Sequence, residues 1–347
     1  MKLKIIKNLN REKISFFSRK KYLRLDKNEK VNNFSKKIIK KIKLISFDLT
    51  AYPEVGAIYK LLSKNLKIPV DQLILTPGSD FGLRICFDYF CKNKKKIMCL
   101  DPTFGMVDVY SKIHNSKKIK IDYDKNLKLN LIKLYKNLNK KISLIILANP
   151  NSPTGTVIEK RDIFKIVKKA NNLNIPVIID EAYFGFYKYS FIGFIKKFNN
   201  LIILRTFSKS FGLAGLRAGY IVSSKKIIEQ LTKFKPMYEI NSVACKILEI
   251  FLKNKNFENQ LINEILTGKK FFQNELSKLK LNYLKTYANF LHVDLGKKKK
   301  FIEKKLISKK ILTRKGPGVK GFENYLRFTL GPISEMKKVI KILKSNV

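Results

Sequence analysis

The chain has 347 residues, 45% of them hydrophobic, which suits one large domain plus a smaller one and is too apolar for a disordered protein. Its formal net charge is +47, but 64 of the 73 basic residues are Lys and only nine are Arg, a usage typical of an AT-rich genome rather than of a nucleic-acid-binding surface. The four Cys and two His show no metal-ligand spacing, so we expect no metal site and no chemistry built on a His cluster.

The N-terminal stretch, residues 1–13, is basic but lacks the apolar centre of a secretory signal. No apolar run elsewhere approaches the roughly 20 residues that a membrane-spanning helix needs. Free and mostly buried thiols are expected of cysteines in a reducing cytosol. We therefore expect a cytoplasmic protein that does not associate with a membrane.

Short apolar runs rich in β-branched residues alternate with longer amphipathic stretches through the first two thirds of the chain. The runs that predict strands are residues 73–76, 96–100, 118–122, 143–148, 176–180, 201–205 and 219–222. Several are apolar throughout, as expected of strands covered on both faces. Residues 159–171, between two of them, carry Ile163, Ile166, Val167 and Ala170 at helical spacing. This alternation predicts an α/β fold with a mostly parallel, doubly wound sheet.

The pattern changes after about residue 225, where long stretches rich in Lys, Leu and Ile predict helices at residues 242–255 and 258–280. Two short strand-like segments follow, at residues 289–295 and 325–329. These elements predict a second, smaller α+β domain. The predicted large domain is residues 46–235, and the predicted small domain is residues 1–45 and 236–347.

Ligands of an open α/β sheet bind beyond the carboxyl ends of its strands, and the sequence is unusual at four such ends. After the first strand, the Gly turn of residues 77–80 opens an apolar helix. This turn is either a seat for a phosphate group, bound by free N–H groups and the helix dipole, or an ordinary helix cap. After residues 143–148, the loop of residues 149–155 contains two prolines and a glycine. Such a rigid loop either holds the Asn151 amide against a ligand or is a plain turn.

Two further strand ends carry charged residues. Asp180 ends a buried strand, where a carboxylate is costly unless it meets a cation. A protonated ring nitrogen of a ligand would supply that cation; the alternatives are a structural ion pair and a helix N-cap. The next strand leads into residues 206–217, where hydroxyls surround Lys209 and Arg217 follows eight positions later. Because a planar guanidinium grips phosphate better than an ammonium does, an Arg in this Lys-rich chain indicates an anion.

Together, these motifs resemble the fold-type I pyridoxal-phosphate enzymes, and specifically the histidinol-phosphate aminotransferase family. Residues 148–155, the sequence Asp-Glu-Ala-Tyr at 180–183 and residues 205–220 match that family in order and in spacing. The resemblance extends from about residue 25 to residue 331, nearly the whole chain. It implies a fold-type I transferase whose large domain binds pyridoxal 5′-phosphate, and an aminotransferase activity.

The resemblance also implies a role for each residue around the cofactor ring. Lys209 is implied to form a Schiff base with pyridoxal phosphate and then to move a proton between substrate and cofactor. Asp180 is implied to pair with the protonated ring nitrogen, which keeps the ring an electron sink. Asn151 and Tyr183 would hydrogen-bond the 3-oxygen of the ring, and Phe104 would stack on its face.

The cofactor's phosphate group is implied to bind between the Gly turn and the segment around Lys209. The residues implied are Arg217, Ser208, Thr206 and the backbone of Ser79 and Asp80. Tyr52 matches a Tyr that reaches into the neighbouring subunit's site in this family. That match implies a homodimer with composite active sites, acting on a small-molecule amino donor and a 2-oxo acid acceptor.

Substrate binding is implied to fall mainly to the small domain. Arg327 matches the Arg that binds the substrate carboxylate, and Arg314 matches a second anion-binding Arg. The alternative for Arg314 is a surface loop in which it pairs with Glu323. The other positions that match the family beside the substrate are Asn28, Asn151 and Asn289.

Three functions are consistent with these features. The first is an aminotransferase with histidinol phosphate, or another phosphorylated or aromatic amine, as donor and 2-oxoglutarate as acceptor. The second is a pyridoxal-phosphate-dependent decarboxylase of a phosphorylated amino acid, which would release CO₂ instead of transferring nitrogen. The third, a basic nucleic-acid binder, predicts charge on one face, whereas the Lys residues are spread along the chain.

The chain departs from the family pattern at Lys30-Val31 and at residues 315–321, on the substrate side of the site.

Overall fold

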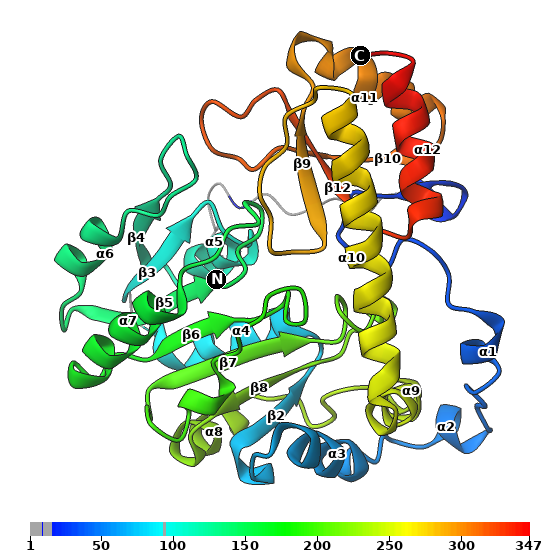
Figure 1. Ribbon diagram of the computed structural model, residues 1–347. Helices are drawn as coiled ribbons and strands as arrows, with labels where there is room; N and C mark the ends of the chain where they lie inside the picture. The colour runs from blue at the N-terminus through cyan, green and yellow to red at the C-terminus, as the bar shows by residue number, and fades with distance from the viewer. Residues whose placement is uncertain (1–8, 10–15, 93–94) are drawn as a thin grey trace, which may run out of the picture.

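The computed structural model describes residue 9, residues 16–92 and residues 95–347 (Figure 1). The basic stretch of residues 1–13, in which we expect no secretory signal, lies outside the described residues except for Leu9. In the part of the chain that is described, no helix is both long enough and apolar enough to cross a membrane.

A seven-stranded sheet forms the centre of the larger part of the molecule, in the strand order β2-β8-β7-β6-β5-β3-β4 (Figure 1). Its strands are β2 (Leu73–Thr76), β3 (Lys96–Asp101), β4 (Lys117–Asp122), β5 (Ile142–Ala148), β6 (Val177–Asp180), β7 (Leu201–Thr206) and β8 (Gly219–Ser223). Each lies within one residue of a predicted run at either end, and the predicted mostly parallel sheet is confirmed. Strand β8 is antiparallel to both neighbours, because a short connection through the 3-10 turn η4 (Ala214–Leu216), without a crossover helix, joins it to β7.

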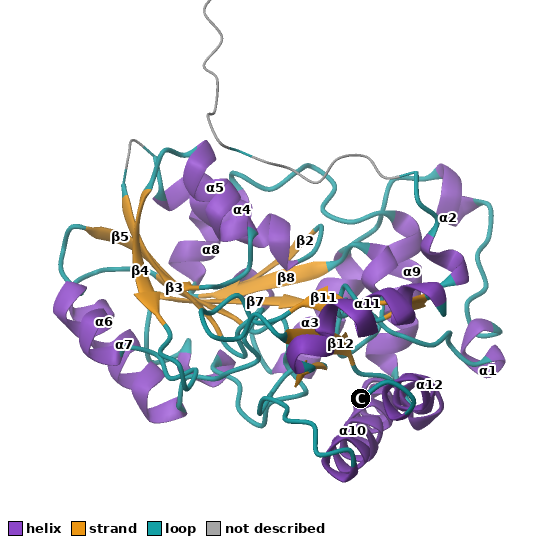
Figure 2. Cartoon of the chain, turned by 90° about the horizontal axis from the view of Figure 1, so that it is seen from above, coloured by secondary structure: helices purple, strands orange, loops and turns teal. Residues whose placement is uncertain are grey.

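Helices cover both faces of this sheet, as Figure 2 shows. One face packs against α3 (Gly56–Leu66), α6 (Leu131–Asn137), α7 (Lys160–Asn172) and α9 (Ser242–Lys253). The other packs against α4 (Ser79–Phe90), α5 (Met106–Ile113) and α8 (Lys225–Thr232). Successive residues of β5 alternate between the two cores, with Ile145 and Leu147 in the first and Leu144 and Ile146 in the second. This is why the strand sequences are apolar throughout.

A smaller unit with its own hydrophobic core lies beside the large sheet (Figure 1). It contains the antiparallel strands β11 (Arg314–Lys315), β12 (Tyr325–Thr329) and β9 (Phe290–Asp294), in that order, and the helices α10 (Lys255–Lys278), α11 (Lys299–Ser308) and α12 (Ile333–Lys344). Strand β1 (Leu23–Arg24) pairs in parallel with β10 (Ile311–Leu312) and joins the N-terminal chain to this unit. The predicted smaller α+β unit is therefore confirmed.

The domain boundaries remain a proposal. Helix α9 and the start of α10 contribute Ala244, Leu248 and Leu261 to the core of the large sheet, whereas Phe272 and Leu276 of α10 belong to the core of the small unit. We therefore propose that the second boundary falls within α10 rather than at residue 235.

The remaining short elements are η1 (Arg19–Lys21), α1 (Lys36–Ile39), α2 (Phe47–Thr50), η2 (Val70–Gln72), η3 (Ile192–Phe194) and η5 (Gly296–Lys298).

Candidate active site

The four unusual strand ends meet at one edge of the large sheet. Strands β5 and β6 are parallel neighbours with Ala148 opposite Asp180, and β7 runs beside β6 in the same direction. Strand β2 is separated from β7 by the antiparallel β8 and so also runs in that direction. The loops that carry Gly78, Asn151 and Lys209 therefore leave the sheet on the same side as Asp180, where an open α/β sheet binds ligands.

Asp180 is buried at the end of β6, with 8% of its surface exposed. Its Oδ1 accepts a hydrogen bond from the Ala182 N–H at 3.0 Å. Burial raises the pKa of the Asp180 carboxyl to about 6, and the bond from Ala182 opposes that rise. Within the described residues Asp180 has no ion-pair partner and caps no helix, so neither structural alternative accounts for it. A ligand cation would remove the cost of burying this carboxylate.

The neighbouring acid, Glu181, forms the buried ion pair instead. Arg205, on β7, donates to Glu181 Oε2 from Nε at 3.0 Å and from a terminal nitrogen at 2.8 Å. The Arg205 guanidinium also lies 3.4 Å from the centroid of the Phe184 ring. This pair ties the end of the strand that carries Asp180 to the strand that leads to Lys209. The sequence analysis missed it; the available signal was a scarce Arg near a strand end and two consecutive acids after the neighbouring strand.

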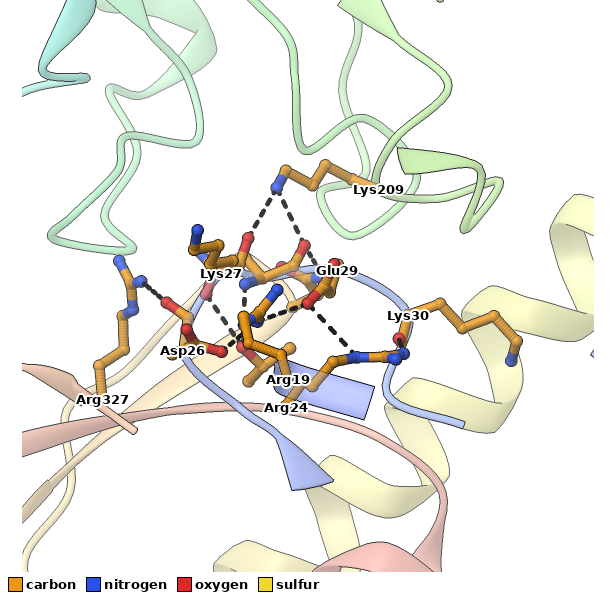
Figure 3. Close-up of polar contacts among 11 residues, drawn as sticks. Arg19, Arg24, Asp26, Lys27, Glu29, Lys30, Lys209 and Arg327 are labelled. Atoms are coloured by element: carbon orange, nitrogen blue, oxygen red, sulfur yellow. Dashed lines mark hydrogen bonds and ion pairs between the residues drawn. The ribbon is translucent and has the colours of Figure 1, made fainter. Parts of the chain in front are cut away.

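Lys209 follows β7, and its amine points toward the N-terminal segment (Figure 3). The Nζ donates to the carbonyls of Lys27 at 3.2 Å and Asn28 at 3.0 Å, and it lies 5.8 Å from the centroid of the Tyr183 ring. Burial lowers the pKa of the Lys209 amine below its ordinary value. A lowered pKa makes the neutral amine more available, which is the form that attacks a carbonyl and accepts a proton.

Asn28 connects Tyr183 to the small sheet. Its Nδ2 donates to the Tyr183 hydroxyl at 2.8 Å, and its backbone N–H donates to the Thr329 hydroxyl at 3.0 Å. The Asn28 carbonyl accepts a bond from Asn289 Nδ2 at 3.2 Å. Asn289 Oδ1 is buried without a hydrogen-bond partner among the described residues, so it is available to a ligand. The structure thus brings together three residues predicted from distant parts of the chain.

Asn151 is buried in the loop after β5, and its amide is already hydrogen-bonded. Its Nδ2 donates to the Pro102 carbonyl and to the Thr154 hydroxyl, each at 2.9 Å, while its Oδ1 accepts a bond from the Thr103 hydroxyl at 2.9 Å. Phe104 follows Thr103 directly, and 37% of its surface is exposed. Asn151 is therefore rigidly placed, and the Phe104 ring beside it has a surface that a ligand can cover.

The Gly78 turn and Arg217 form a small cradle. Gly78 has φ +82°, and a Cβ placed on it would lie only 2.9 Å from a terminal nitrogen of Arg217, so the guanidinium lies directly against the turn. Thr76 and Thr206 both pair with Gly219 in the sheet, which puts this turn beside the segment that contains Thr206. A side chain at Gly78 would fill the cradle, so the site requires glycine.

The remaining residues predicted to bind phosphate surround the same cradle. The Thr206 hydroxyl donates to Ser208 Oγ at 2.9 Å. Ser79 opens α4, and its backbone nitrogen lies beside the start of β8. The Asp80 carboxylate accepts a bond from the Tyr110 hydroxyl at 2.9 Å, which leaves its backbone N–H as the group to meet an anion. A helix N-terminus, two hydroxyls and an Arg together suit a phosphate group.

Arg327 and Arg314 are opposite each other on the neighbouring strands β12 and β11. Arg327 is 8% exposed; a terminal nitrogen donates to the Asp26 carbonyl at 2.7 Å, while its Nε is buried without a partner among the described residues. Arg314 is exposed and pairs with no described acid. Arg314 forms no ion pair with Glu323, whose carboxylate accepts a bond from the Gly321 N–H at 3.0 Å. Two guanidinium groups are therefore available to anions.

Of two further features predicted to lie at the site, Tyr52 lies away from it and the segment of residues 315–321 lies beside it. Tyr52 is 74% exposed and stacks on Tyr238, with ring centroids 4.3 Å apart, so the structure does not bring it to the Lys209 of its own chain. The unusual segment of residues 315–321 does reach the site, because a Cβ on Gly318 would lie 3.7 Å from Pro102, whose carbonyl binds Asn151.

His292 is a second residue that the sequence analysis missed. It is fully buried on β9, opposite Arg327 in the strand register, and its Nε2 lies 2.7 Å from the Pro153 carbonyl. Burial lowers the pKa of His292 to about 4, so the ring is neutral at neutral pH and donates from Nε2 to that carbonyl. This bond holds the loop that carries Asn151 against the small sheet.

The fold and this set of residues define a fold-type I pyridoxal-phosphate-dependent enzyme. The family model for aminotransferase class I and II matches residues 27–343. The chain therefore belongs to the aminotransferase class I and II family, and it is a pyridoxal-phosphate-dependent aminotransferase.

Three known proteins illustrate the similarity. A histidinol-phosphate aminotransferase from Clostridium novyi is 34% identical over 330 residues, 93% of this chain and 91% of the relative. One from Buchnera aphidicola is 36% identical over 310 residues, 85% of each chain. The crystal structure of histidinol-phosphate aminotransferase from Sinorhizobium meliloti in complex with pyridoxal-5'-phosphate has a TM-score of 0.83 at 19% identity, covering 93% of this chain and 91% of that one. The last comparison shows the shared fold.

Proposed function

We propose that the protein is a histidinol-phosphate aminotransferase, which moves the amino group of histidinol phosphate, or of another phosphorylated or aromatic amine, to 2-oxoglutarate. The two relatives described above are named for this activity. The structural observation that carries the proposal is the pair of Arg327 and Arg314, with a buried, unpartnered Nε on Arg327. A donor with a phosphate group and an acceptor with two carboxylates would be bound in turn by this pair.

The residues at the sheet edge fit pyridoxal phosphate. They provide a buried carboxylate at Asp180 that pairs with no cation of the described residues, a cradle at Gly78 that a side chain would fill, and a partly buried amine at Lys209. When bound, this cofactor supplies an aldehyde carbon and a ring that withdraws electrons from the substrate Cα. In this proposal Asp180 keeps the proton on the ring nitrogen, and Phe104 covers one face of the ring.

Lys209 performs the proton transfer in this proposal. With the cofactor bound, the Lys209 amine would hold it covalently, and once released it would accept and return a proton at the substrate Cα. Burial lowers the pKa of this amine, which favours the neutral form that accepts a proton. Tyr183 and Asn151 would bind the 3-oxygen of the cofactor ring. Asn28 orients the Tyr183 hydroxyl. Asn151 would give up one of its present hydrogen bonds, such as that to the Pro102 carbonyl, to bind this oxygen. The phosphate group is held by Ser79 N–H, Asp80 N–H, Thr206, Ser208 and Arg217.

Replacing Arg327 by Lys tests the substrate assignment. An ammonium loses the two-pronged contact with an anion, and a charge-assisted hydrogen bond contributes enough that kcat/KM should fall by about ten- to a hundredfold. The fall is expected with both the amine donor and 2-oxoglutarate, varied separately in steady-state kinetics. Arg161→Lys is the matched control, because Arg161 lies on α7 with a side chain 82% exposed and no role in the site.

The companion variant Arg314→Lys separates the possible donors. A fall in kcat/KM for both substrates supports a donor with a distal anion. If Arg314→Lys has no effect with any donor while Arg327→Lys does, the donor lacks that anion and histidinol phosphate is wrong. Unchanged kinetics in Arg327→Lys would refute the carboxylate assignment. Release of CO₂ without transfer of nitrogen to 2-oxoglutarate would show that the enzyme is instead a decarboxylase.

We also propose that the protein is a homodimer with composite active sites. Large apolar side chains are exposed around α2 and before α9: Phe47 at 56%, Leu49 at 69%, Tyr52 at 74% and Met237 at 81%. The stacking of Tyr52 on Tyr238 joins the two segments into one patch. A patch of this kind marks a protein interface. A second copy covering it would place Tyr52 within reach of the partner's cofactor.

Mixing two variants, Tyr52→Phe and Lys209→Ala, tests the composite site. A hybrid dimer contains one site with both native residues, so random exchange should restore about one quarter of the native activity per subunit. Activity is measured after the subunits have been exchanged under mild denaturant and the dimers have been confirmed by sedimentation. A fully active monomer, or hybrid dimers without recovered activity, would contradict the proposal.

The cytoplasm is the proposed location. All four cysteines, Cys86, Cys91, Cys99 and Cys245, are buried and form no disulfide. Unpaired thiols of this kind are typical of proteins in reducing compartments.

A further inference from the structure

The segment of residues 26–30, called here the strap, lies between the small sheet and the Lys209 loop (Figure 3). Its backbone contacts two of the residues to which we assign chemistry. The Asp26 carbonyl accepts a bond from Arg327 at 2.7 Å, and the carbonyls of Lys27 and Asn28 accept bonds from Lys209 Nζ at 3.2 and 3.0 Å. The Asn28 side chain adds a bond to Tyr183 at 2.8 Å. The position of the strap therefore affects the amine, the ring-binding Tyr and the anion-binding Arg together.

Arg19 binds the two carboxylates of the strap, which is also held by an ion pair between Lys30 and Glu264 at 3.2 Å. A single terminal nitrogen of Arg19, in η1, contacts both the Asp26 carboxylate and Glu29 Oε1, the latter at 2.6 Å. Arg24 supports the same region, with Nε 3.5 Å from Glu29 Oε1 and a terminal nitrogen 3.3 Å from the Lys30 carbonyl. The two carboxylates converge on one guanidinium, so without it they would repel each other and separate.

The choice of residue type supports a specific role for this contact. Only nine of the 73 basic residues are Arg, and Arg19 begins the run Arg19-Lys20-Lys21. The two lysines of this run are exposed, whereas Arg19 is partly buried against the strap. One terminal nitrogen of Arg19 binds both carboxylates, and its Nε is buried without a hydrogen-bond partner among the described residues. The planar guanidinium directs this nitrogen at both carboxylates with less loss of conformational freedom than the flexible stem of a Lys would require.

We propose that Arg19 is a positioning residue for the transamination: by pairing with Asp26 and Glu29 it fixes the strap, and through the strap it sets the placement of Tyr183 and Arg327. The inference rests on the proposed function for its kinetic consequence. Its structural part, the ordering of the strap by Arg19, is independent of which amine is the donor.

The test uses the holoenzyme and compares Arg19→Ala with the native protein. Loss of charge-assisted bonds to two carboxylates should lower kcat/KM by about ten- to a hundredfold for donor and acceptor alike. Amide hydrogen exchange, measured by mass spectrometry on the peptide that contains residues 26–30, should become faster, while exchange in the central strands stays unchanged. Arg19→Lys should recover part of the loss, because an ammonium reaches one carboxylate. Arg161→Ala is the matched control and should change neither measurement.

A double-mutant cycle distinguishes the loss of the contacts with Asp26 and Glu29 from a general loss of stability in Arg19→Ala. In a background with Asp26→Asn and Glu29→Gln, Arg19 has no carboxylates to hold, so Arg19→Ala should have a much smaller further effect on kcat/KM. Unchanged strap exchange in Arg19→Ala overturns the inference, and so does faster exchange with unchanged kcat/KM. If no amine donor reacts with the native enzyme, the proposed function fails, yet the exchange measurement still decides whether Arg19 orders the strap.

Discussion

Lys209→Ala should abolish turnover, with a fall in kcat of about four orders of magnitude, because general acid–base catalysis alone contributes up to about 10⁴ and the covalent attachment of the cofactor is lost as well. The native protein should be yellow, and reduction with borohydride should leave the mass of the cofactor on the peptide that contains Lys209. The motivation is a partly buried amine with a lowered pKa at the end of β7, close to Tyr183 and the strap.

The control for this prediction must be another Lys, since the chain contains 64 of them. Lys165, exposed on α7, is suitable, and Lys165→Ala should retain native activity and borohydride labelling. A native protein that stays colourless and unlabelled after incubation with pyridoxal phosphate would contradict the assignment. Labelling at a different Lys, with Lys209→Ala still active, would place the chemistry elsewhere in the chain.

The sheet and the strand-end residues could be predicted from sequence because two local signals coincide there. Strands covered on both faces are apolar throughout, and the Gly- and Pro-rich turns after them mark where they end. In β5 this signal locates the strand to within one residue and also locates the loop that carries Asn151. The position of Lys209 among 64 lysines is identified by its surroundings, a strand before it and hydroxyls on both sides, rather than by residue type.

The partners of these residues could not be predicted in the same way. Asp180 and Glu181 are adjacent, and side chains at adjacent positions of an extended chain point in opposite directions. Only the packed structure shows that Glu181 is the one that faces Arg205. The strap binds Lys209 through the carbonyls of Lys27 and Asn28, and a backbone carbonyl carries no signal specific to a residue type.

The sequence also does not predict which residues of α10 belong to each of the two hydrophobic cores. Helix α10 is one continuous helix, yet Leu261 near its start packs in the core of the large sheet and Phe272 further along packs in the core of the small unit. An amphipathic pattern predicts that a helix has a buried face but not which core covers that face. This division of α10 between the two cores is the reason for proposing a boundary within α10 in place of the one predicted at residue 235.

Asp180→Ala should leave the fold and part of the cofactor binding intact while lowering kcat by about a hundred- to a thousandfold, the effect expected when one partner of a buried charge pair is removed. Burial raises the pKa of this carboxyl to about 6 against the opposing hydrogen bond from Ala182, so the group is mostly ionised at pH 7.5. A protonated ring nitrogen beside Asp180 would lower the pKa of the carboxyl below that raised value, because an opposite charge favours the ionised form. In the proposed site, the carboxylate and the ring proton would therefore stabilise each other at neutral pH.

Two conservative variants separate the charge of Asp180 from its shape. Asp180→Asn keeps the size and the bond from Ala182 but loses the charge, so it should be impaired nearly as much as Asp180→Ala. Asp180→Glu keeps the charge and should retain more activity than either. Asp71→Asn is the matched control, since Asp71 is a surface acid that pairs with Lys225 at 3.2 Å, and it should be fully active. The measurements are steady-state kinetics and the absorption spectrum of the bound cofactor. Near-native turnover in Asp180→Asn would show that the charge at this strand end does not act on the ring, and the role assigned to Asp180 would then be wrong.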